Sequence, residues 1–288
     1  MKVSGFTFIR NGLKLDYPFI EAITSILPIC DELIVVVGNS EDETRQAIVD
    51  LNEPKIKIID TVWDENLREG GRILAQQTDI AMQHITGDWG FYIQGDEVIH
   101  EKYLATVKQA MLENLNKPEV QGLLFKYKHF YGSYDYVGDS RKWYRREIRV
   151  VRNNIGVSSY RDAQGFRIDN KKLKVKLIDA EIFHYGWVRD PRAQQLKAES
   201  FQKLWHDDEW MEQNICKAEE ADYNLLESLA KFEGTHPQVL TERLKRMNWK
   251  FDYEPTLKKP QTFKEKLSNF IEKNTGYRFG EYKNYKII

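Results

Sequence analysis

The feature that most constrains what this chain can fold into is an uninterrupted aliphatic run, Leu33-Ile34-Val35-Val36-Val37. Because no polar residue breaks the run, it predicts a strand buried on both faces, as in a parallel sheet that helices cover on both sides. Strands are also predicted over 3–9 and 56–60, and helices over 16–27 and 44–51. Strand and helix alternating at this spacing predict βαβ units and an α/β fold with a mainly parallel sheet.

A second stretch, residues 88–97, joins a short buried strand to a polar turn. A helix is predicted over 73–85 and a strand over 89–93, which ends in Gln94-Gly95-Asp96-Glu97. The acids therefore lie at the carboxyl end of a strand, where open α/β sheets bind ligands. Adjacent carboxylates there suit a divalent cation that neutralises a diphosphate, because Mg²⁺ and Mn²⁺ prefer oxygen ligands. The alternative is a solvated turn that caps the next helix.

The second half of the chain departs from this alternation. A helix is predicted over 102–115, strands over 122–130, 143–152 and 174–182, and irregular structure over 131–138 and 157–169. From residue 190 onward the pattern is mostly helical, with Pro191 suited to a first turn. We therefore expect a sheet domain over 1–190 and a helical extension over 191–288. The basic and aromatic end of this extension, from Arg243, either packs on the sheet domain or contacts a partner or a membrane surface.

Composition excludes several classes of protein. The chain has 288 residues, 41% of them hydrophobic and 12% aromatic, which suits a large folded domain rather than a disordered protein. Its net charge of −1 argues against a nucleic-acid binder. Two cysteines, Cys30 and Cys216, indicate passive thiols in a reducing compartment. With no signal-peptide core and no apolar run of roughly 20 residues, the chain is expected to be soluble and cytoplasmic.

Three pieces of the chain, in this order and spacing, resemble one protein family. They are Arg10-Asn11 after the first strand, Asn39-Ser40-Glu41-Asp42-Glu43-Thr44 after the second, and Gln94-Gly95-Asp96-Glu97. Together they resemble family 2 glycosyltransferases with the nucleotide-diphospho-sugar transferase (GT-A) fold, over residues 1–191. The resemblance implies a mainly parallel, mixed sheet flanked by helices, in a Rossmann-like arrangement.

The resemblance also implies an activity. In this family an inverting transferase moves a sugar from a nucleotide-diphosphate sugar, most often a UDP-sugar, to the hydroxyl of a carbohydrate or lipid-linked acceptor. A divalent cation, Mn²⁺ or Mg²⁺, assists the transfer. Polysaccharide or glycoconjugate synthesis is implied as the setting, with the protein cytoplasmic or peripheral at the inner face of the membrane.

The resemblance implies roles for particular residues at the donor site. Those implied to bind the nucleotide sugar are Arg10, Asn11, Asn39, Ser40, Asp42, Arg72, Gln76, Gln94 and Asp96. Arg72 and Gln76 follow Gly70-Gly71, in the segment that closes over the nucleotide in the family. An ordinary helix start explains both residues equally well.

The metal site departs from the family pattern. Asp96 matches the second aspartate of the Asp-x-Asp signature and is implied to contact the metal or the diphosphate. The first aspartate is Gln94 here, which has no charge but can hydrogen-bond a ribose hydroxyl. A second departure concerns the nucleotide base: Gly38 stands where the second strand usually ends in an acid, so contact with the base must come from another residue. His184 is implied to complete the metal shell, because imidazole suits Mn²⁺ better than Mg²⁺. The alternative is a histidine hydrogen-bonded in a turn.

Inverting transfer needs a carboxylate that takes the proton of the attacking hydroxyl. The resemblance places this base at Asp162, with Asp169 and Glu147 as rivals.

Two further groups have two interpretations each. Arg145, Arg149 and Arg152 either offset phosphate charge or an anionic acceptor, or line a solvated strand face. The aromatic loop over 130–136 either stacks an acceptor sugar or packs on its own domain.

Three other functions compete with glycosyl transfer. A sugar-nucleotide pyrophosphorylase shares the sheet architecture. It needs a glycine-rich, lysine-containing phosphate loop after the first strand, and this sequence has none there. A nicotinamide dehydrogenase needs Gly-x-Gly-x-x-Gly there, and Arg10-Asn11-Gly12 does not supply it. A non-catalytic nucleotide-sugar-binding protein is the main alternative, because Gln94 and Gly38 weaken the signature.

Overall fold

The computed structural model describes the chain except residues 65, 68, 207, 215–220, 222–227, 252 and 254–262. Cys30 is buried with a free thiol, and burial raises its pKa to about 12. Cys216 lies outside the described residues. In the described part of the chain, no helix is both long and apolar enough to cross a membrane.

The first half of the chain forms the predicted parallel sheet. Its elements are β1 (Val3–Ile9), α1 (Phe19–Ile26), η1 (Leu27–Ile29), β2 (Glu32–Gly38), α2 (Thr44–Val49), β3 (Ile56–Thr61), η2 (Glu69–Gly71), α3 (Arg72–Gln83) and β4 (Trp89–Tyr92). The four strands are parallel in the order β4-β1-β2-β3, with Phe6 of β1 opposite both Ile34 of β2 and Tyr92 of β4. The predicted α/β class is confirmed. The predicted helix over 16–27 is shorter at its start, because Asp16 has a positive φ of 50° and Pro18 is the N-cap of α1.

The next elements turn the sheet into a mixed one. They are β5 (Glu97–Ile99), η3 (Glu101–Tyr103), α4 (Leu104–Glu113), β6 (Gly122–Tyr131), β7 (Tyr136–Gly138), β8 (Arg146–Arg152), β9 (Val157–Tyr160), β10 (Gly165–Ile168), β11 (Lys171–Lys172) and β12 (Lys174–Trp187). β8 is antiparallel to β4 and β6, whereas β12 is parallel to β6 and antiparallel to β5.

Three predictions for this region are wrong. Residues 136–138, within the stretch predicted as irregular, form β7, which pairs with β6. Residues 157–169 are not irregular: β9 and β10 form a hairpin that, with β11, makes a separate three-stranded sheet. These strands pair only with one another among the described elements, and their side-chain pattern is too short to show a period. β12 continues to Trp187 instead of ending at 182, because 182–184 pair with β5 on one side and β6 on the other.

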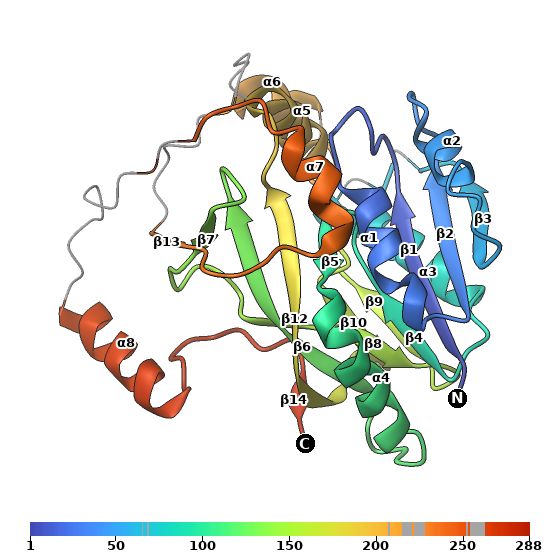
Figure 1. The fold of residues 1–288 in the computed structure, drawn as a ribbon, viewed down its shortest axis with the longest axis vertical. Helices are drawn as coiled ribbons and strands as arrows, with labels where there is room; N and C mark the ends of the chain where they lie inside the picture. Colours follow the sequence, from blue (N-terminus) through green and yellow to red (C-terminus); the bar gives the residue numbers. More distant parts are fainter. Residues whose placement is uncertain are drawn as a thin grey trace.

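The C-terminal region adds strands as well as helices. It contains α5 (Pro191–Gln202), α6 (Asp208–Asn214), β13 (Leu229–Lys231), η4 (Gln238–Leu240), α7 (Thr241–Lys245), α8 (Phe263–Thr275) and β14 (Lys286–Ile287). β13 pairs with β7 and β14 with β12, so the middle and the end of this region both join the main sheet (Figure 1). The expected helical extension is therefore helical only in part.

Core side chains alternate between the two faces of the sheet. Val35 and Val37 belong to a hydrophobic cluster with α1 and α4, whereas Ile34 and Val36 belong to a cluster with α3 and the small sheet. Figure 1 shows α1 and α4 together on one side of the sheet. Helices on both faces explain why the aliphatic run contains no polar residue.

A buried ion pair anchors the turn between β4 and β5. Arg149 of β8 donates from Nε to Glu97 Oε2 at 2.7 Å and from Nη2 to Oε1 at 2.6 Å, and its side chain is 2% exposed against 0% for Glu97. The hydroxyl of Tyr127 on β6 donates to Glu97 Oε1 at 2.6 Å, and the backbone N–H of Gln94 donates to Oε2 at 3.1 Å. Residues 94–97 are thus held against two strands of the sheet.

Replacing Arg149 by Met should lower the free energy of unfolding by about 3–5 kcal/mol, because it leaves the Glu97 carboxylate buried without its partner. Urea denaturation measures the change. Arg45→Met, which breaks the exposed ion pair with Asp60, is the matched control and should have little effect. Equal losses in the two variants would contradict this view of the turn.

Candidate functional site

The carboxyl ends of β1, β3 and β4 open on one cleft of about 1000 Å³. Arg10 and Asn11 come from the end of β1, Trp63 follows β3, and Gln94 to Asp96 follow β4. The other walls come from β8, β12, α5 and residues 278–284. Figure 1 shows α5 at the end of the sheet toward which β1 and β2 run. The cleft therefore lies where an open α/β sheet presents its ligand site.

The structure brings together some of the predicted site residues. Those that line the cleft are Arg10, Asn11, Gln94, Asp96, Asp162 and His184. Asn39, Ser40, Asp42, Arg72 and Gln76 are not among its lining residues, and neither is Asp169. The role of each predicted residue stays a prediction.

Asn39, Ser40 and Asp42 connect neighbouring loops. Ser40 Oγ accepts the backbone N–H of Asn11 at 2.9 Å, and Asn39 Oδ1 accepts that of Trp63 at 3.1 Å. The Asp42 carboxylate accepts the N–H groups of residues 14 and 44 at 2.6 and 3.0 Å. These bonds fix the shape of the loop after β1, which carries Arg10 and Asn11 into the cleft.

A steric constraint explains why residue 38 is a glycine and not the acid that usually ends the second strand in the family. A Cβ atom at Gly38 would lie 2.4 Å from Nε1 of Trp63, so the indole fills the space that a side chain would need. The guanidinium of Arg10 lies over the same indole, 5.4 Å from the ring centroid. An aromatic wall therefore stands where the family usually has an acid.

The glycine pair before α3 contacts the proposed base. Gly70 and Gly71 have φ values of 65° and 68°, and a Cβ atom at Gly71 would come within 2.7 Å of Cβ of Asp162. Arg72 and Gln76 begin α3 with exposed side chains. Gly71 thus gives Asp162 room, which the sequence alone does not indicate.

Asp96 and His184 come together through strand pairing. β5 pairs antiparallel with β12 so that His184 is opposite Glu97, and the Tyr185 N–H donates to the Asp96 carbonyl at 2.8 Å. His184 Nε2 then lies 3.7 Å from Asp96 Oδ2. A Cβ atom at Gly186 would lie 2.5 Å from His184 Nε2 and 2.9 Å from Asp96 Oδ2, so only glycine fits beside the two.

Lys197 of α5 is a third member of this group, which sequence reasoning missed. Its Nζ donates to Asp96 Oδ2 at 3.0 Å and to the Gly186 carbonyl at 2.8 Å, and its side chain is 14% exposed. Arg189, which is fully buried, donates to the same Gly186 carbonyl at 3.2 Å. In sequence Lys197 is one lysine in a polar helix, and no pattern distinguishes it.

Burial and charge act in opposite directions on this group. Burial raises the pKa of Asp96, but the nearby Lys197, His184 and Arg189 outweigh it and hold that pKa well below its usual range. Burial, with repulsion from Arg189, lowers the pKa of Lys197 to about 8. Burial also lowers the pKa of His184 to about 4, so the imidazole is neutral at pH 7. At neutral pH the group therefore holds one carboxylate, two cations and a neutral imidazole.

A second histidine orients His184. His129 Nε2 faces the Tyr144 carbonyl at 2.8 Å, so this nitrogen carries the ring proton and donates it. His129 Nδ1 must then accept from Nδ1 of His184, at 3.0 Å. The Nε2 lone pair of His184 is thereby directed toward Asp96.

The predicted divalent cation fits these residues poorly. Among the described residues, no group of three histidine, cysteine or acidic side chains could hold a metal ion. Asp96 and His184 provide two donors, but Lys197 already occupies the Asp96 oxygen that faces the imidazole. Gln94, in the place of the first signature aspartate, adds no charge to balance a divalent ion. The role of Asp96 and His184 as metal ligands stays a prediction. The position of Lys197 counts against it.

Two carboxyl groups in the cleft differ in protonation. Glu147 is half-buried as a residue, but its Oε2 atom is buried. Burial of the carboxyl group, with the charges of Glu97 and Asp162, raises its pKa to about 8 despite Arg149. Burial also raises the pKa of Asp162 above its usual value. Glu147 and Asp169 are the rivals of Asp162 for the role of the base. Glu147 holds its proton at pH 7 and cannot take another, and Asp169 is exposed and lies outside the cleft. Asp162 fits the role of a base better than either.

Several buried polar atoms of the cleft have no hydrogen-bond partner within the described structure. They are Trp63 Nε1, Trp143 Nε1, Glu147 Oε2, Asp162 Oδ1, Gln194 Oε1 and Asn284 Oδ1. Buried donors and acceptors are normally paired, because an unpaired one costs the full desolvation of the group. Their concentration in one cleft indicates a polar ligand site.

The three predicted phosphate-binding arginines have other partners. Arg149 is paired with Glu97, and Arg152 donates to four backbone carbonyls of residues 114–120. Arg145 binds Glu281 with two hydrogen bonds of 2.8 Å. Arg149 is buried, so it does not line a solvated strand face. A phosphate-binding role for the three arginines stays a prediction, against which their protein partners count.

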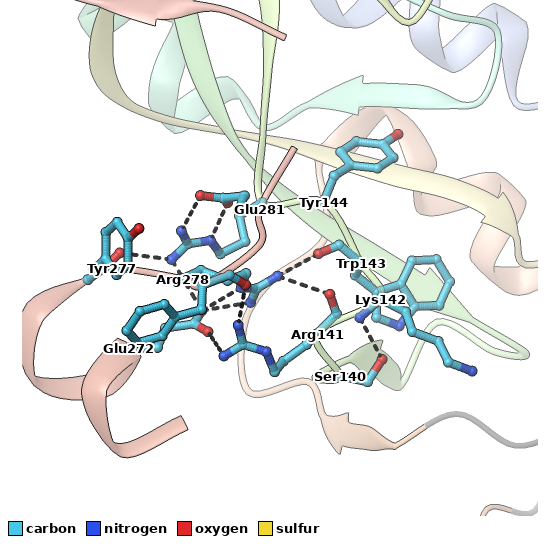
Figure 2. A network of polar contacts seen from close by, with 12 residues as sticks. Ser140, Arg141, Lys142, Trp143, Tyr144, Glu272, Tyr277, Arg278 and Glu281 are labelled. Atoms are coloured by element: carbon cyan, nitrogen blue, oxygen red, sulfur yellow. Dashed lines mark hydrogen bonds and ion pairs between the residues drawn. The ribbon is translucent and has the colours of Figure 1, made fainter. Parts of the chain in front are cut away.

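The loop before β8 and the segment after α8 make one wall of the cleft. Figure 2 shows Arg141 and Arg278 converging on Glu272, with nitrogen–oxygen distances of 2.9 and 2.8 Å. Arg278 also donates to the Trp143 carbonyl at 2.9 Å. These bonds join two segments more than a hundred residues apart, and residues 278–282 therefore line the cleft.

The aromatic loop over 130–136 does not supply the exposed rings of the cleft. Phe130, Tyr131 and Tyr134 are 0%, 8% and 5% exposed and pack in the core, so the packing alternative is correct. Exposed rings in the cleft lining come instead from Tyr144, Trp187, Phe201, Phe279 and Tyr282.

No family model and no curated protein matches this chain. Several solved structures do. TarS of S. aureus is 16% identical with a TM-score of 0.41, over 70% of this chain and 39% of TarS. A Pyrobaculum calidifontis mannosyltransferase, in complex with GDP-Man and Mn²⁺, is 20% identical with a TM-score of 0.32, over 42% of this chain and 34% of that chain.

Glucosyl-3-phosphoglycerate synthase of Mycobacterium tuberculosis, in complex with Mg²⁺ and uridine-diphosphate, is 19% identical with a TM-score of 0.29, over 45% of this chain and 43% of that chain. The chain thus spans less than half the length of each of these three structures. At such scores they assign no residue and no ligand to this chain, and membership of glycosyltransferase family 2 stays a prediction.

The Glu147→Gln variant should be more stable than the wild type at pH 7.5, with the advantage vanishing near pH 4.5. The folded state keeps the Glu147 proton up to pH about 8, whereas the unfolded state releases it near its usual pKa of 4.5. The folded state therefore binds more protons between these values, and its stability falls as the pH rises through this window.

Urea denaturation at several pH values checks this, with the exposed Glu233→Gln as control. A stability difference that does not change between pH 4.5 and 7.5 would contradict the raised pKa.

Proposed function

We propose that the cleft binds a nucleotide-diphosphate sugar and that the protein transfers its sugar to an acceptor hydroxyl with inversion. The observation that carries the proposal is that buried polar atoms without a hydrogen-bond partner in the described structure line the same cleft as Asp96 and the cation Lys197. A second cation, the buried Arg189, donates to the same Gly186 carbonyl as Lys197. Such a site suits a ligand that is both anionic and rich in hydrogen-bonding groups. The resemblance of the motifs to family 2 glycosyltransferases supports the same function.

The proposed roles follow the walls of the cleft. Arg10 and Trp63 are placed to hold the nucleoside, because a flat indole and a guanidinium suit a base. Gln94 donates from Nε2 to the Ala163 carbonyl at 3.5 Å. This bond holds the β9–β10 hairpin, with Asp162, beside the turn over 94–97. The donor diphosphate is proposed to face Lys197, and the acceptor the exposed rings of Trp187 and Tyr282.

The proposed reaction is a single displacement. The acceptor oxygen forms a bond to the anomeric carbon while the bond from that carbon to the diphosphate oxygen breaks, and the electron pair leaves with the nucleoside diphosphate. Asp162 takes the proton of the acceptor hydroxyl as it attacks. Cations beside the leaving group stabilise its developing negative charge.

Nucleotide binding is the first test. UDP, GDP, dTDP or CDP should raise the stability of the protein, by about 2.7 kcal/mol at a concentration of 100 times its Kd. Thermal unfolding with each nucleotide measures the change in stability. The nucleotide that raises the unfolding temperature identifies the nucleobase of the donor. Absence of a shift with all four, with and without Mn²⁺, would contradict the proposed function.

The Asp162→Asn variant should slow transfer by about 10²- to 10⁴-fold while keeping nucleotide affinity, because the amide cannot take a proton. The assay is release of nucleoside diphosphate from a panel of nucleotide sugars, with water as the acceptor. Asp169→Asn tests the exposed rival and should retain activity. Pyrophosphate among the products would indicate a pyrophosphorylase, and binding without release by the wild type would indicate a non-catalytic binding protein.

A further inference from the structure

We infer that the ammonium of Lys197 is a built-in cation for the donor diphosphate, so that binding and transfer need no divalent metal. The inference rests on the proposed function and specifies how its site neutralises the leaving group. It concerns a residue outside every motif that the sequence analysis identified.

The position of Lys197 is fixed from three sides. The Asp96 carboxylate and the Gly186 carbonyl accept two of its three N–H groups, at 3.0 and 2.8 Å, and the ammonium lies over the Tyr17 ring, 5.0 Å from its centroid. An ammonium group has three donors, so one remains for a ligand in the cleft. The side chain is 14% exposed and lines the cleft, so a phosphate can reach it.

The balance of charge favours a resident cation over a divalent ion. In the family signature, two aspartates offset a divalent cation. Here Gln94 replaces one of them, while Lys197 and the buried Arg189 surround the carboxylate that remains. The group therefore has an excess of one positive charge before any ligand binds. A divalent ion would raise this to three, whereas the negative charge of a diphosphate would offset it.

Gly186 and α5 make the arrangement specific. Gly186 leaves space for His184 and Asp96 and offers its carbonyl to both Lys197 and Arg189. α5 begins at Pro191 with Asp190 as its N-cap, whose side chain accepts the Arg192 N–H at 2.9 Å. Lys197 follows two turns later, so a capped helix and a backbone carbonyl determine where the charge lies.

The test compares nucleotide binding in EDTA and in Mn²⁺ by calorimetry, using whichever of UDP, GDP, dTDP or CDP binds. The wild type should bind equally well in both. Lys197→Met should bind about 10- to 100-fold more weakly in EDTA, because a charge-assisted hydrogen bond is lost. Lys108→Gln, an exposed lysine on α4 outside the cleft, is the control and should bind as the wild type does.

Lys197→Glu provides a second, independent readout. It places a second carboxylate beside Asp96 and His184, so the variant should bind Mn²⁺ directly and should bind the nucleotide only when Mn²⁺ is present. Direct titration with Mn²⁺ alone measures the first effect without any nucleotide. Thermal unfolding of each variant in EDTA shows that it is folded before binding is measured.

The outcomes separate the two proposals. Nucleotide binding that requires Mn²⁺ in the wild type, or that is the same in Lys197→Met and in the wild type, overturns the inference and leaves the proposed function standing. No binding of any of the four nucleotides, in EDTA or in Mn²⁺, overturns the proposed function and this inference with it.

Discussion

The ion pair between Glu97 and Arg149 is the interaction on which the candidate site depends. It is buried and bidentate, and it holds the turn after β4 against β6 and β8. Glu97 also begins β5, whose pairing with β12 brings His184 and Gly186 beside Asp96. A buried pair of this kind contributes little net stability compared with apolar packing, but it fixes one arrangement of the chain, because a displaced partner would leave a charge buried alone.

The departures from the family signature are connected through packing and charge. Gly38 lacks the usual acid because the indole of Trp63 occupies that space, and Gln94 lacks the usual charge in a group where two cations already surround one carboxylate. In a metal-dependent site, the uncharged Gln94 alone would weaken the binding of the cation, whereas Gly38 removes a contact to the nucleotide base. Together they leave a cleft that is aromatic at the nucleoside end of the proposed ligand and cationic at its diphosphate end.

The sequence predicted well what local patterns determine. The strands over 3–9, 33–37 and 56–60 are present because each carries a local signal, an uninterrupted aliphatic run over 33–37 and apolar residues interspersed with polar ones in the other two. The polar ends of the first and fourth strands do line the cleft. Prediction failed where pairing between distant segments decides the structure. The extension of β12 to Trp187 arises from such pairing. The hairpin over 157–168 was missed for another reason, because its strands are too short to show a period.

The same limit explains which site residues were missed. Lys197 belongs to a helix whose sequence has no distinctive pattern, and its role depends on the distance of that helix from a turn a hundred residues earlier. Arg149 was predicted to face a ligand or solvent, because a cationic strand gives no sign that one of its charges has a buried partner.

The backbone around Asp162 gives a further reason to regard it as functional. Arg161 and Ala163, on either side of it, have φ values of 56° and 60°, a region that residues other than glycine rarely adopt. Such conformations persist only where the surroundings enforce them, and they concentrate at functional sites. Here Gly71 gives the Asp162 side chain room, and Gln94 donates to the Ala163 carbonyl. Gly71 and the turn over 94–97 therefore both act on this hairpin. The backbone strain, the unpaired carboxylate oxygen and the raised pKa of Asp162 thus occur at one residue of the cleft wall, and the role of a base accounts for all three together.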